Sequence, residues 1–253
     1  MTPDWTPLDA ELARWMDAGL CLPLWWRDDD AVRPTAELDR LNTLSGRLGL
    51  PVHLAVIPAG ATPELAAVCA SAPQLIPVVH GWAHRNNAPA GEKKAEFGAH
   101  RPAEETLADA KRGLETLRAV FGDAVQPLFV PPWNRIGRGT VQGLAGLGYS
   151  ALSTFKPRKA AEAAPGLVQI NTHLDPIAWK TRRALVPPQQ LIAQVTGQLA
   201  DRREGRADNR EPYGLLTHHL VHDGAIWAFT EALAARLLAG PARAWAFTER
   251  TLP

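Results

Sequence analysis

The chain has 253 residues and is 46% hydrophobic, enough for one large domain or two small ones, and a single α/β barrel falls in that range. Lysine and arginine together number 27 against 26 acidic residues, which leaves a formal net charge of +1. This balance gives no reason to expect nucleic acid or an anionic membrane surface as a partner, whereas a neutral glycan is compatible with it.

The cysteine pattern and the N-terminus bear on location. Cys21 and Cys69 are the only cysteines, and they form neither a C-x-x-C pair nor a disulfide framework. The N-terminal stretch lacks a basic region followed by an apolar one, so we expect no secretory signal. No run of 18 apolar residues occurs, so no transmembrane helix is expected and the predicted location is the cytoplasm.

Short apolar runs alternate with helical patterns from residue 22 onward. We expect strands at 22–27, 51–57, 75–79, 128–130, 149–154, 167–174, 214–220 and 244–247. Expected helices follow Thr35, which caps the first, then start near Pro63 and cover about 102–121, 138–147, 187–199 and 225–238. Residues 85–101 and 201–210 are expected to be surface loops. Neither a repeat nor a linker divides the chain, so we expect one domain over 1–253.

This alternation predicts a parallel sheet, either closed as a barrel or open and doubly wound. The candidate polar residues stand where strands end: Asp28, Asp29, His80, Trp133 and His218. In a β/α barrel the loops that carry catalytic groups converge at that edge, so these side chains are expected to lie together.

Two histidines follow the third expected strand. His80 and His84 are four residues apart and can bind one metal ion if the segment turns back on itself. A structural turn at a strand end is the alternative explanation of this pattern.

The acidic triplet Asp28-Asp29-Asp30 directly follows the first strand. A cation relieves the repulsion between adjacent carboxylates, and one aspartate with two histidines leaves a coordination position open for water. A neighbouring carboxylate can then act as a general base. The alternative is a solvated acidic turn that caps the next helix.

Four segments in order resemble the motifs of the polysaccharide deacetylases of the NodB-homology type (carbohydrate esterase family 4). They are 26–30 (WRDDD), 80–84 (HGWAH), 131–133 (PPW) and 216–218 (LTH). The family motifs are an aromatic residue with Asp-Asp-Gly, His-x-x-x-His, Arg-x-Pro-aromatic-Gly and Leu-x-His. The resemblance extends from residue 22 to about 225 and implies a distorted (β/α)7 barrel.

Carried over residue by residue, the resemblance implies a set of roles. Asp28 would be the catalytic base and His218 the general acid, while Asp29, His80 and His84 would hold a divalent metal, with zinc expected. Trp133, with Pro132, would wall the substrate groove. Trp82 is a further groove candidate because flat apolar rings pack on sugar faces.

The sequence departs from the family pattern at several positions. Val130 stands where the family has the arginine that orients the base, and Asn134 and Asp30 stand in place of glycines. The arginine's role is therefore vacant or is taken by Arg27, Arg101 or Arg135. Ala178 replaces the aspartate that would pair with the missing arginine, so the chain resembles a divergent branch of the family.

The remaining histidines are expected to be mainly structural. His219 should face away from His218 along a strand, His222 is expected to be solvated, and His53 and His100 are expected in structural or surface positions. His173, which stands at a strand end near Asp175, is a weaker candidate for the site.

The resulting hypothesis is a metal-dependent hydrolase that removes an acetyl or other acyl group from an N-acetylated sugar or polysaccharide. Two alternatives stay open: a relative that acts on another C–N bond, and a non-catalytic glycan-binding protein that retains the metal site. Either would fit the missing arginine. The sequence does not indicate an oligomeric state.

Overall fold

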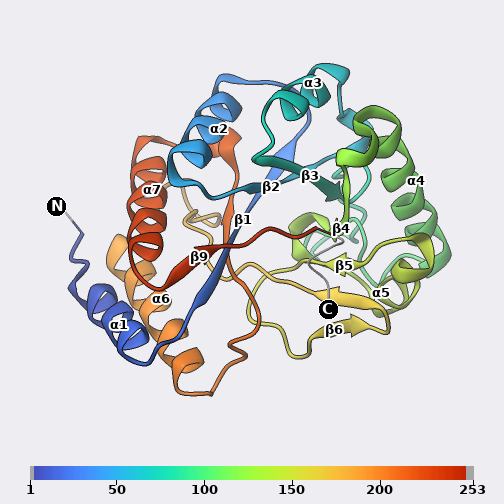
Figure 1. Cartoon of the computed structure of the whole chain (residues 1–253). Helices are drawn as coiled ribbons and strands as arrows, with labels where there is room; N and C mark the ends of the chain where they lie inside the picture. Colours follow the sequence, from blue (N-terminus) through green and yellow to red (C-terminus); the bar gives the residue numbers. More distant parts are fainter. Residues whose placement is uncertain (1–2, 249–253) are drawn as a thin grey trace.

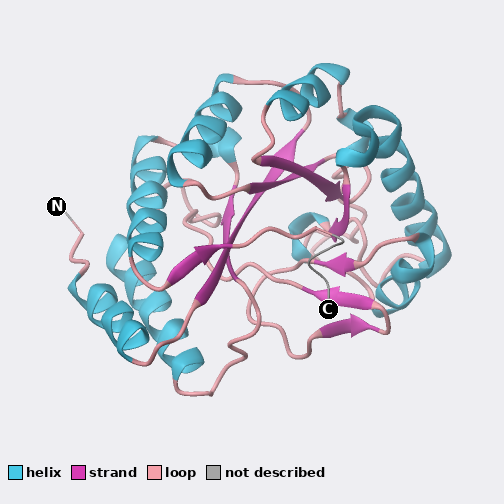
Figure 2. Cartoon of the chain, viewed as in Figure 1, coloured by secondary structure: helices cyan, strands magenta, loops and turns pink. Residues whose placement is uncertain are grey.

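The computed structural model describes residues 3–248, and in it helices surround a curved sheet (Figures 1 and 2). The strands are β1 (Leu22–Ala31), β2 (Val52–Val56), β3 (Leu75–His80), β4 (Gln126–Val130), β5 (Ala151–Leu152), β6 (Glu162–Ala164), β7 (Leu167–Gln169), β8 (Tyr213–Thr217) and β9 (Ala242–Ala244). The α-helices are α1 (Thr6–Asp17), α2 (Ala36–Leu48), α3 (Pro63–Ser71), α4 (Ala103–Phe121), α5 (Arg138–Leu144), α6 (Pro188–Arg203) and α7 (Gly224–Ala239).

The sheet has the strand order β6-β7-β5-β4-β3-β2-β1-β8, with β9 paired to β1, and every pairing except β6 with β7 is parallel. A single bridge from Leu174, after β7, to Leu215 of β8 approaches closure, but the sheet is not closed. The expected barrel-like α/β architecture is therefore confirmed, with an open sheet. Its parallel strands bring their carboxyl ends to one edge.

Local sequence signals account for the helix boundaries. Thr35 and Thr62 cap α2 and α3 by accepting hydrogen bonds from the backbone N–H groups of Leu38 (3.1 Å) and Leu65 (3.3 Å). Asp223 caps α7 in the same way. The helices expected after Thr35 and Pro63, and over 102–121, 187–199 and 225–238, are confirmed to within a few residues.

The structure differs from the sequence interpretation at both ends of the chain. No element was expected before residue 22, but α1 packs against α6, and its Trp15 indole N–H donates to the carbonyl of Leu199 (3.1 Å). The last strand lies at 242–244 rather than 244–247, and β8 ends at Thr217. Residues 219–221 form a 3₁₀ turn instead of extending that strand, which changes where the histidines after His218 point.

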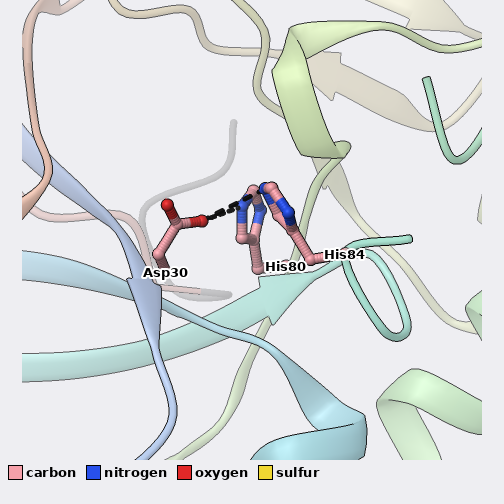
Figure 3. Close-up of side chains that lie close together, drawn as sticks. All are labelled: Asp30, His80 and His84. Atoms are coloured by element: carbon pink, nitrogen blue, oxygen red, sulfur yellow. Dashed lines mark hydrogen bonds and ion pairs between the residues drawn. The ribbon is translucent and has the colours of Figure 1, made fainter. Parts of the chain in front are cut away.

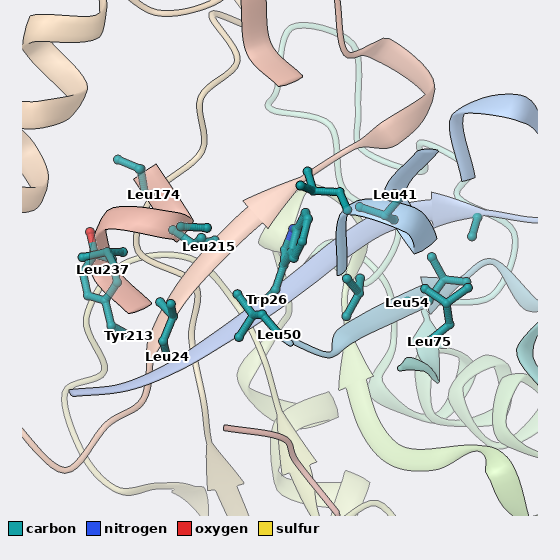
Figure 4. Close-up of a cluster of buried hydrophobic side chains, with 14 of the residues drawn as sticks. Leu24, Trp26, Leu41, Leu50, Leu54, Leu75, Leu174, Tyr213, Leu215 and Leu237 are labelled. Atoms are coloured by element: carbon teal, nitrogen blue, oxygen red, sulfur yellow. The ribbon is translucent and has the colours of Figure 1, made fainter. Parts of the chain in front are cut away.

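The core lies between the sheet and the surrounding helices. Figure 4 shows Trp26 of β1 packed among leucines of neighbouring elements, including Leu41 and Leu54. All three side chains are fully buried. Within residues 3–248, no helix is both long and apolar enough to cross a membrane.

A second apolar cluster encloses His53 of β2. Its Nδ1–H donates to the carbonyl of Trp26 (3.1 Å), and its Nε2 accepts the N–H of Phe247 (2.8 Å), which ties the C-terminal segment to the strands. Trp25 and Trp245 pack on the ring. Burial lowers the pKa of His53 from 6.5 to about 4, so the imidazole is neutral in the folded protein near neutral pH.

This histidine predicts a pH dependence of stability. The unfolded chain protonates His53 below about pH 6.5, whereas the folded chain resists protonation until about pH 4, so its contribution is lost as the pH falls between these values. We expect the wild type to lose about 3 kcal/mol more unfolding free energy between pH 7.5 and 4 than His53→Gln does. Urea unfolding of both proteins at the two pH values checks this. Equal losses would show that His53 is not the group responsible.

Candidate metal centre and active site

The three consecutive aspartates at the end of β1 point in different directions. Successive strand residues face opposite sides of a sheet, so Arg27 and Asp29 share one face while Trp26 and Asp28 share the other. The β1–β2 register shifts between Asp28 and Ala31, and Asp30 has a left-handed φ of 78°. Because of this break in the strand, the Asp30 carboxylate does not follow the alternation of side chains between the two faces of the sheet.

Asp28 lies on the face opposite Arg27 and Asp29, and it is fully buried. It accepts hydrogen bonds from the Thr217 hydroxyl (2.6 Å), the backbone N–H of His219 (3.0 Å) and the His219 ring. Burial opposes its charge, but His219 lowers the pKa of Asp28 below its usual value, and Asp28 in turn raises the pKa of His219. The two residues form a buried ion pair.

Asp30 lies beside the two histidines, and among the described residues these three side chains form the group that could hold a metal ion (Figure 3). One oxygen of its carboxylate is 3.1 Å from Nε2 of His80 and 3.2 Å from Nε2 of His84. His80 is the last residue of β3, and His84 lies in the loop that follows. From the sequence we expect Asp29 beside these histidines, whereas the break in β1 turns the carboxylate of Asp30 toward them.

The donor atoms of this group fit a divalent metal. Nδ1 of His80 lies 3.0 Å from the carbonyl of Val130, which can only accept, so Nδ1 carries a proton. In a neutral ring Nε2 then presents a lone pair to the Asp30 oxygen, and two acceptors at 3.1 Å need a cation or a second proton between them. Ligand atoms about 2.0–2.1 Å from a tetrahedral zinc lie about 3.3 Å apart, close to the separations found here.

The electrostatics of the two rings differ. Burial opposes protonation of His80, but Asp29 and Asp30 raise its pKa above the usual value. Burial and the charge of His80 lower the pKa of His84. Despite burial, His80 lowers the pKa of Asp30, so the carboxylate is ionised and available as a ligand.

Arg27 and Asp29 form a buried bidentate ion pair. The guanidinium donates to both carboxylate oxygens of Asp29, at 2.8 and 3.0 Å, and both side chains are buried. Arg27 also donates to the Ser153 hydroxyl (2.7 Å) and to the side-chain oxygen of Asn134 (2.7 Å). Arg27, one of the three arginines considered as a replacement for the missing family arginine, therefore pairs with Asp29 and not with Asp28.

His218 lies at the end of β8, on the same edge. Its Nε2 is 4.0 Å from an Asp29 oxygen, and its ring packs edge-on against Trp179 with centroids 4.6 Å apart. The Trp179 indole N–H donates to Asp175 (2.7 Å). Burial raises the pKa of Asp175, and the charge of His218 partly counteracts that rise.

The predicted groove residues have different surroundings. The Trp133 ring packs against His84, with centroids 4.3 Å apart, and its φ of 56° is left-handed. Pro132 is buried beside Gly81. The Trp82 ring lies under the guanidinium of Arg112 on α4, 3.9 Å from its centroid, so it contacts this helix.

The other histidines have structural partners. His173 is buried and bonded to Glu211 (3.1 Å) and to Arg202 (2.7 Å), so it is occupied away from the candidate site. His219 lies in the 3₁₀ turn after β8 and not on a strand, and it is the charged partner of Asp28. His222, expected to be solvated, packs against Trp227, and burial lowers its pKa to about 4.

Two features of the site could have been found in the sequence, and one could not. The i, i+2 spacing of Arg27 and Asp29 on a strand signals that they share a face. The same alternation excludes Asp28 from the face of Asp29. Nothing local marks Glu96, which lies in an irregular loop and contacts the turn that carries His84.

No protein-family model matches the sequence, and no curated protein matches it significantly. Solved structures do match its fold. A putative polysaccharide deacetylase from Mycobacterium smegmatis has a TM-score of 0.60 at 18% identity, with 81% of this chain and 72% of that chain covered. A family 4 carbohydrate esterase from Streptomyces lividans, in complex with acetate, has a TM-score of 0.54 at 14% identity, covering 91% and 96%.

A third match is a pseudoenzyme of the same esterase family, with a TM-score of 0.56 at 12% identity, covering 88% of this chain and 65% of that one. At these identities the likeness concerns the fold. The resemblance inferred from the motifs is confirmed at that level: the chain has the NodB-type fold of the polysaccharide deacetylases, in a divergent form.

Proposed function

We propose that this protein is a metal-dependent hydrolase that removes an acetyl group from an N-acetylated sugar or polysaccharide. The observation that carries the proposal is the convergence of three groups at one sheet edge. They are the Asp30–His80–His84 donor set, the Asp29 carboxylate held by Arg27, and His218 within 4.0 Å of Asp29. The matched fold of an esterase bound to acetate supports an acyl substrate.

The roles follow from these positions. Asp30, His80 and His84 would hold the metal, which supplies polarisation of the scissile carbonyl and a lowered pKa for water. Asp29 would take the proton of the attacking water, because Arg27 fixes both of its oxygens in place. His218 would donate a proton to the nitrogen as the C–N bond breaks, which releases acetate and a free amine. The proposed base is therefore Asp29, where the resemblance implies Asp28, and the proposed carboxylate ligand is Asp30, where it implies Asp29.

The surroundings of the acid and the ligands support a sugar-binding groove. Trp179 is 42% exposed and packs against His218, and Trp133 packs against His84, so one indole contacts the proposed acid and another contacts a proposed ligand. Exposed indole rings offer flat apolar surfaces to the faces of a sugar. Pro132 and Trp133 would form one wall and Trp179 the other.

Acetate release tests the proposal. Purified protein loaded with zinc is expected to release acetate from N-acetylglucosamine oligomers, to lose this activity with a chelator, and to regain it when zinc is restored. Asp30→Ala serves as the matched negative control. Activity that persists in chelator would contradict the metal requirement.

The non-catalytic alternative gives a different result in the same experiment. A pseudoenzyme shares this fold, and Val130 replaces the family's arginine here. Zinc binding and oligosaccharide binding without acetate release would identify a glycan-binding protein that retains the metal site. The placement of Arg27 on Asp29 favours the enzyme, because a receptor needs no oriented base.

A further inference from the structure

One buried carboxylate outside the expected site residues holds the turn that presents His84. The side chain of Glu96 is 1% exposed. It accepts hydrogen bonds from four consecutive backbone N–H groups, those of Trp82 (3.2 Å), Ala83 (2.9 Å), His84 (3.2 Å) and Arg85 (3.3 Å). Backbone N–H groups gathered in this way form a concave anion site, and here the anion belongs to the protein itself.

The turn needs such a partner because its backbone is unusual. Gly81 and His84 both have left-handed φ values, 57° and 53°. A Cβ on Gly81 would lie 2.5 Å from the Glu96 carboxylate and 2.5 Å from the Pro132 ring, so only glycine fits there. Histidine disfavours the left-handed region, and this conformation persists only where the surroundings enforce it.

The backbone of Glu96 and of the residues on either side of it is held by hydrogen bonds. The Arg101 guanidinium donates to its carbonyl (3.2 Å), and the next residue, Phe97, pairs with Ile136. The preceding N–H, that of Ala95, donates to Asn86 (3.0 Å). The carboxylate is therefore a fixed anchor, and the turn over residues 82–85 forms around it.

We propose that Glu96 is a positioning residue for the metal centre, which sets the direction of His84 by anchoring the backbone of its turn. This inference rests on the proposed function in taking Asp30, His80 and His84 as metal ligands. Glu96 contacts the backbone N–H of His84 and not the Nε2 atom that faces Asp30. It acts by keeping Nε2 of His84 at 3.2 Å from Asp30, where both can share one ion.

Glu96→Gln is the principal test. A carboxamide has one acceptor oxygen, and its NH₂ group would face backbone donors, so the four hydrogen bonds cannot all form. We expect zinc affinity, measured by competition with a chromophoric chelator, to fall about 10- to 100-fold. The visible spectrum of the cobalt-substituted protein should also change, since it reports ligand geometry. Glu96→Asp keeps the charge and both oxygens and should recover part of the affinity.

Two controls separate positioning from a general effect of a lost carboxylate. Glu211→Gln removes another carboxylate of 1% exposure that accepts backbone N–H groups, from Arg158 and Asn171 (both 3.0 Å), and should leave zinc affinity unchanged. In a His84→Ala background, Glu96→Gln should have no further effect on zinc affinity. An additive loss there would show that Glu96 acts by its charge and not through His84, and would overturn the proposal.

Hydrogen exchange tests the anchor without any metal. In the metal-free wild type, the amides of residues 82–85 should be protected although they lie outside helices and strands, and Glu96→Gln should remove that protection. Fast exchange of these amides in the wild type would refute the anchor even if Glu96→Gln failed to fold. If the wild type bound no zinc while its amides were protected, the proposed metal centre would fail and the anchor would stand.

Discussion

Asp30→Ala is expected to abolish zinc binding and Asp29→Asn to leave it unchanged, although the two residues are adjacent. Asp30→Ala removes the carboxylate oxygen that lies within 3.2 Å of Nε2 of both His80 and His84, so zinc affinity should fall more than about 100-fold. Asp29→Asn should keep zinc bound at full stoichiometry but lower deacetylation about 10²- to 10⁴-fold, because an amide cannot take the proton. Metal analysis and acetate release on the same preparations measure both effects.

Asp28→Asn completes the comparison within the triplet. Asp28 is the buried partner of His219, so its loss should appear as a drop in stability of about 3–5 kcal/mol in urea unfolding. Loss of zinc from Asp29→Asn together with its retention by Asp30→Ala would contradict the proposed assignment. That result would instead support the assignment that the motif resemblance implies, in which Asp29 is the metal ligand.

Arg27→Met is expected to be among the most damaging substitutions at the site. Methionine fills a similar volume, but it leaves the Asp29 carboxylate buried without its cation and removes the hydrogen bonds to Ser153 and Asn134. Breaking a buried ion pair from one side costs about 3–5 kcal/mol. Urea unfolding of the metal-free protein should show this loss, and acetate release should fall with it because the base is no longer oriented.

The double variant Arg27→Met with Asp29→Asn identifies the cause. Once Asp29 is neutral, the lost cation leaves no buried charge, so the double variant should be more stable than Arg27→Met alone. Strictly additive losses would mean that Arg27 supports the strands and does not act through Asp29. Arg236→Met, which removes a half-exposed cation paired with Asp9, is a control expected to change stability by less than about 1 kcal/mol.

The order of elements could be predicted from the sequence because it depends on local patterns. Apolar runs bounded by caps mark β1 to β4 and α2 to α4, and because these strands are parallel, the polar residues that follow them stand at the carboxyl edge of the sheet. Local patterns do not predict the packing of α1 on α6, since the contact of Trp15 with Leu199 joins residues 184 positions apart.

The sequence by itself determined which side chains are available to the site: an acidic triplet after one strand, His80 and His84 after another, and His218 after a third. Only the tertiary structure decided which aspartate faces which partner. Strand alternation sends Asp28 to His219 and Asp29 to Arg27, and the left-handed φ of Asp30 turns that carboxylate to the histidines. A one-residue change along a strand reverses the direction of a side chain, and motif spacing alone does not resolve it.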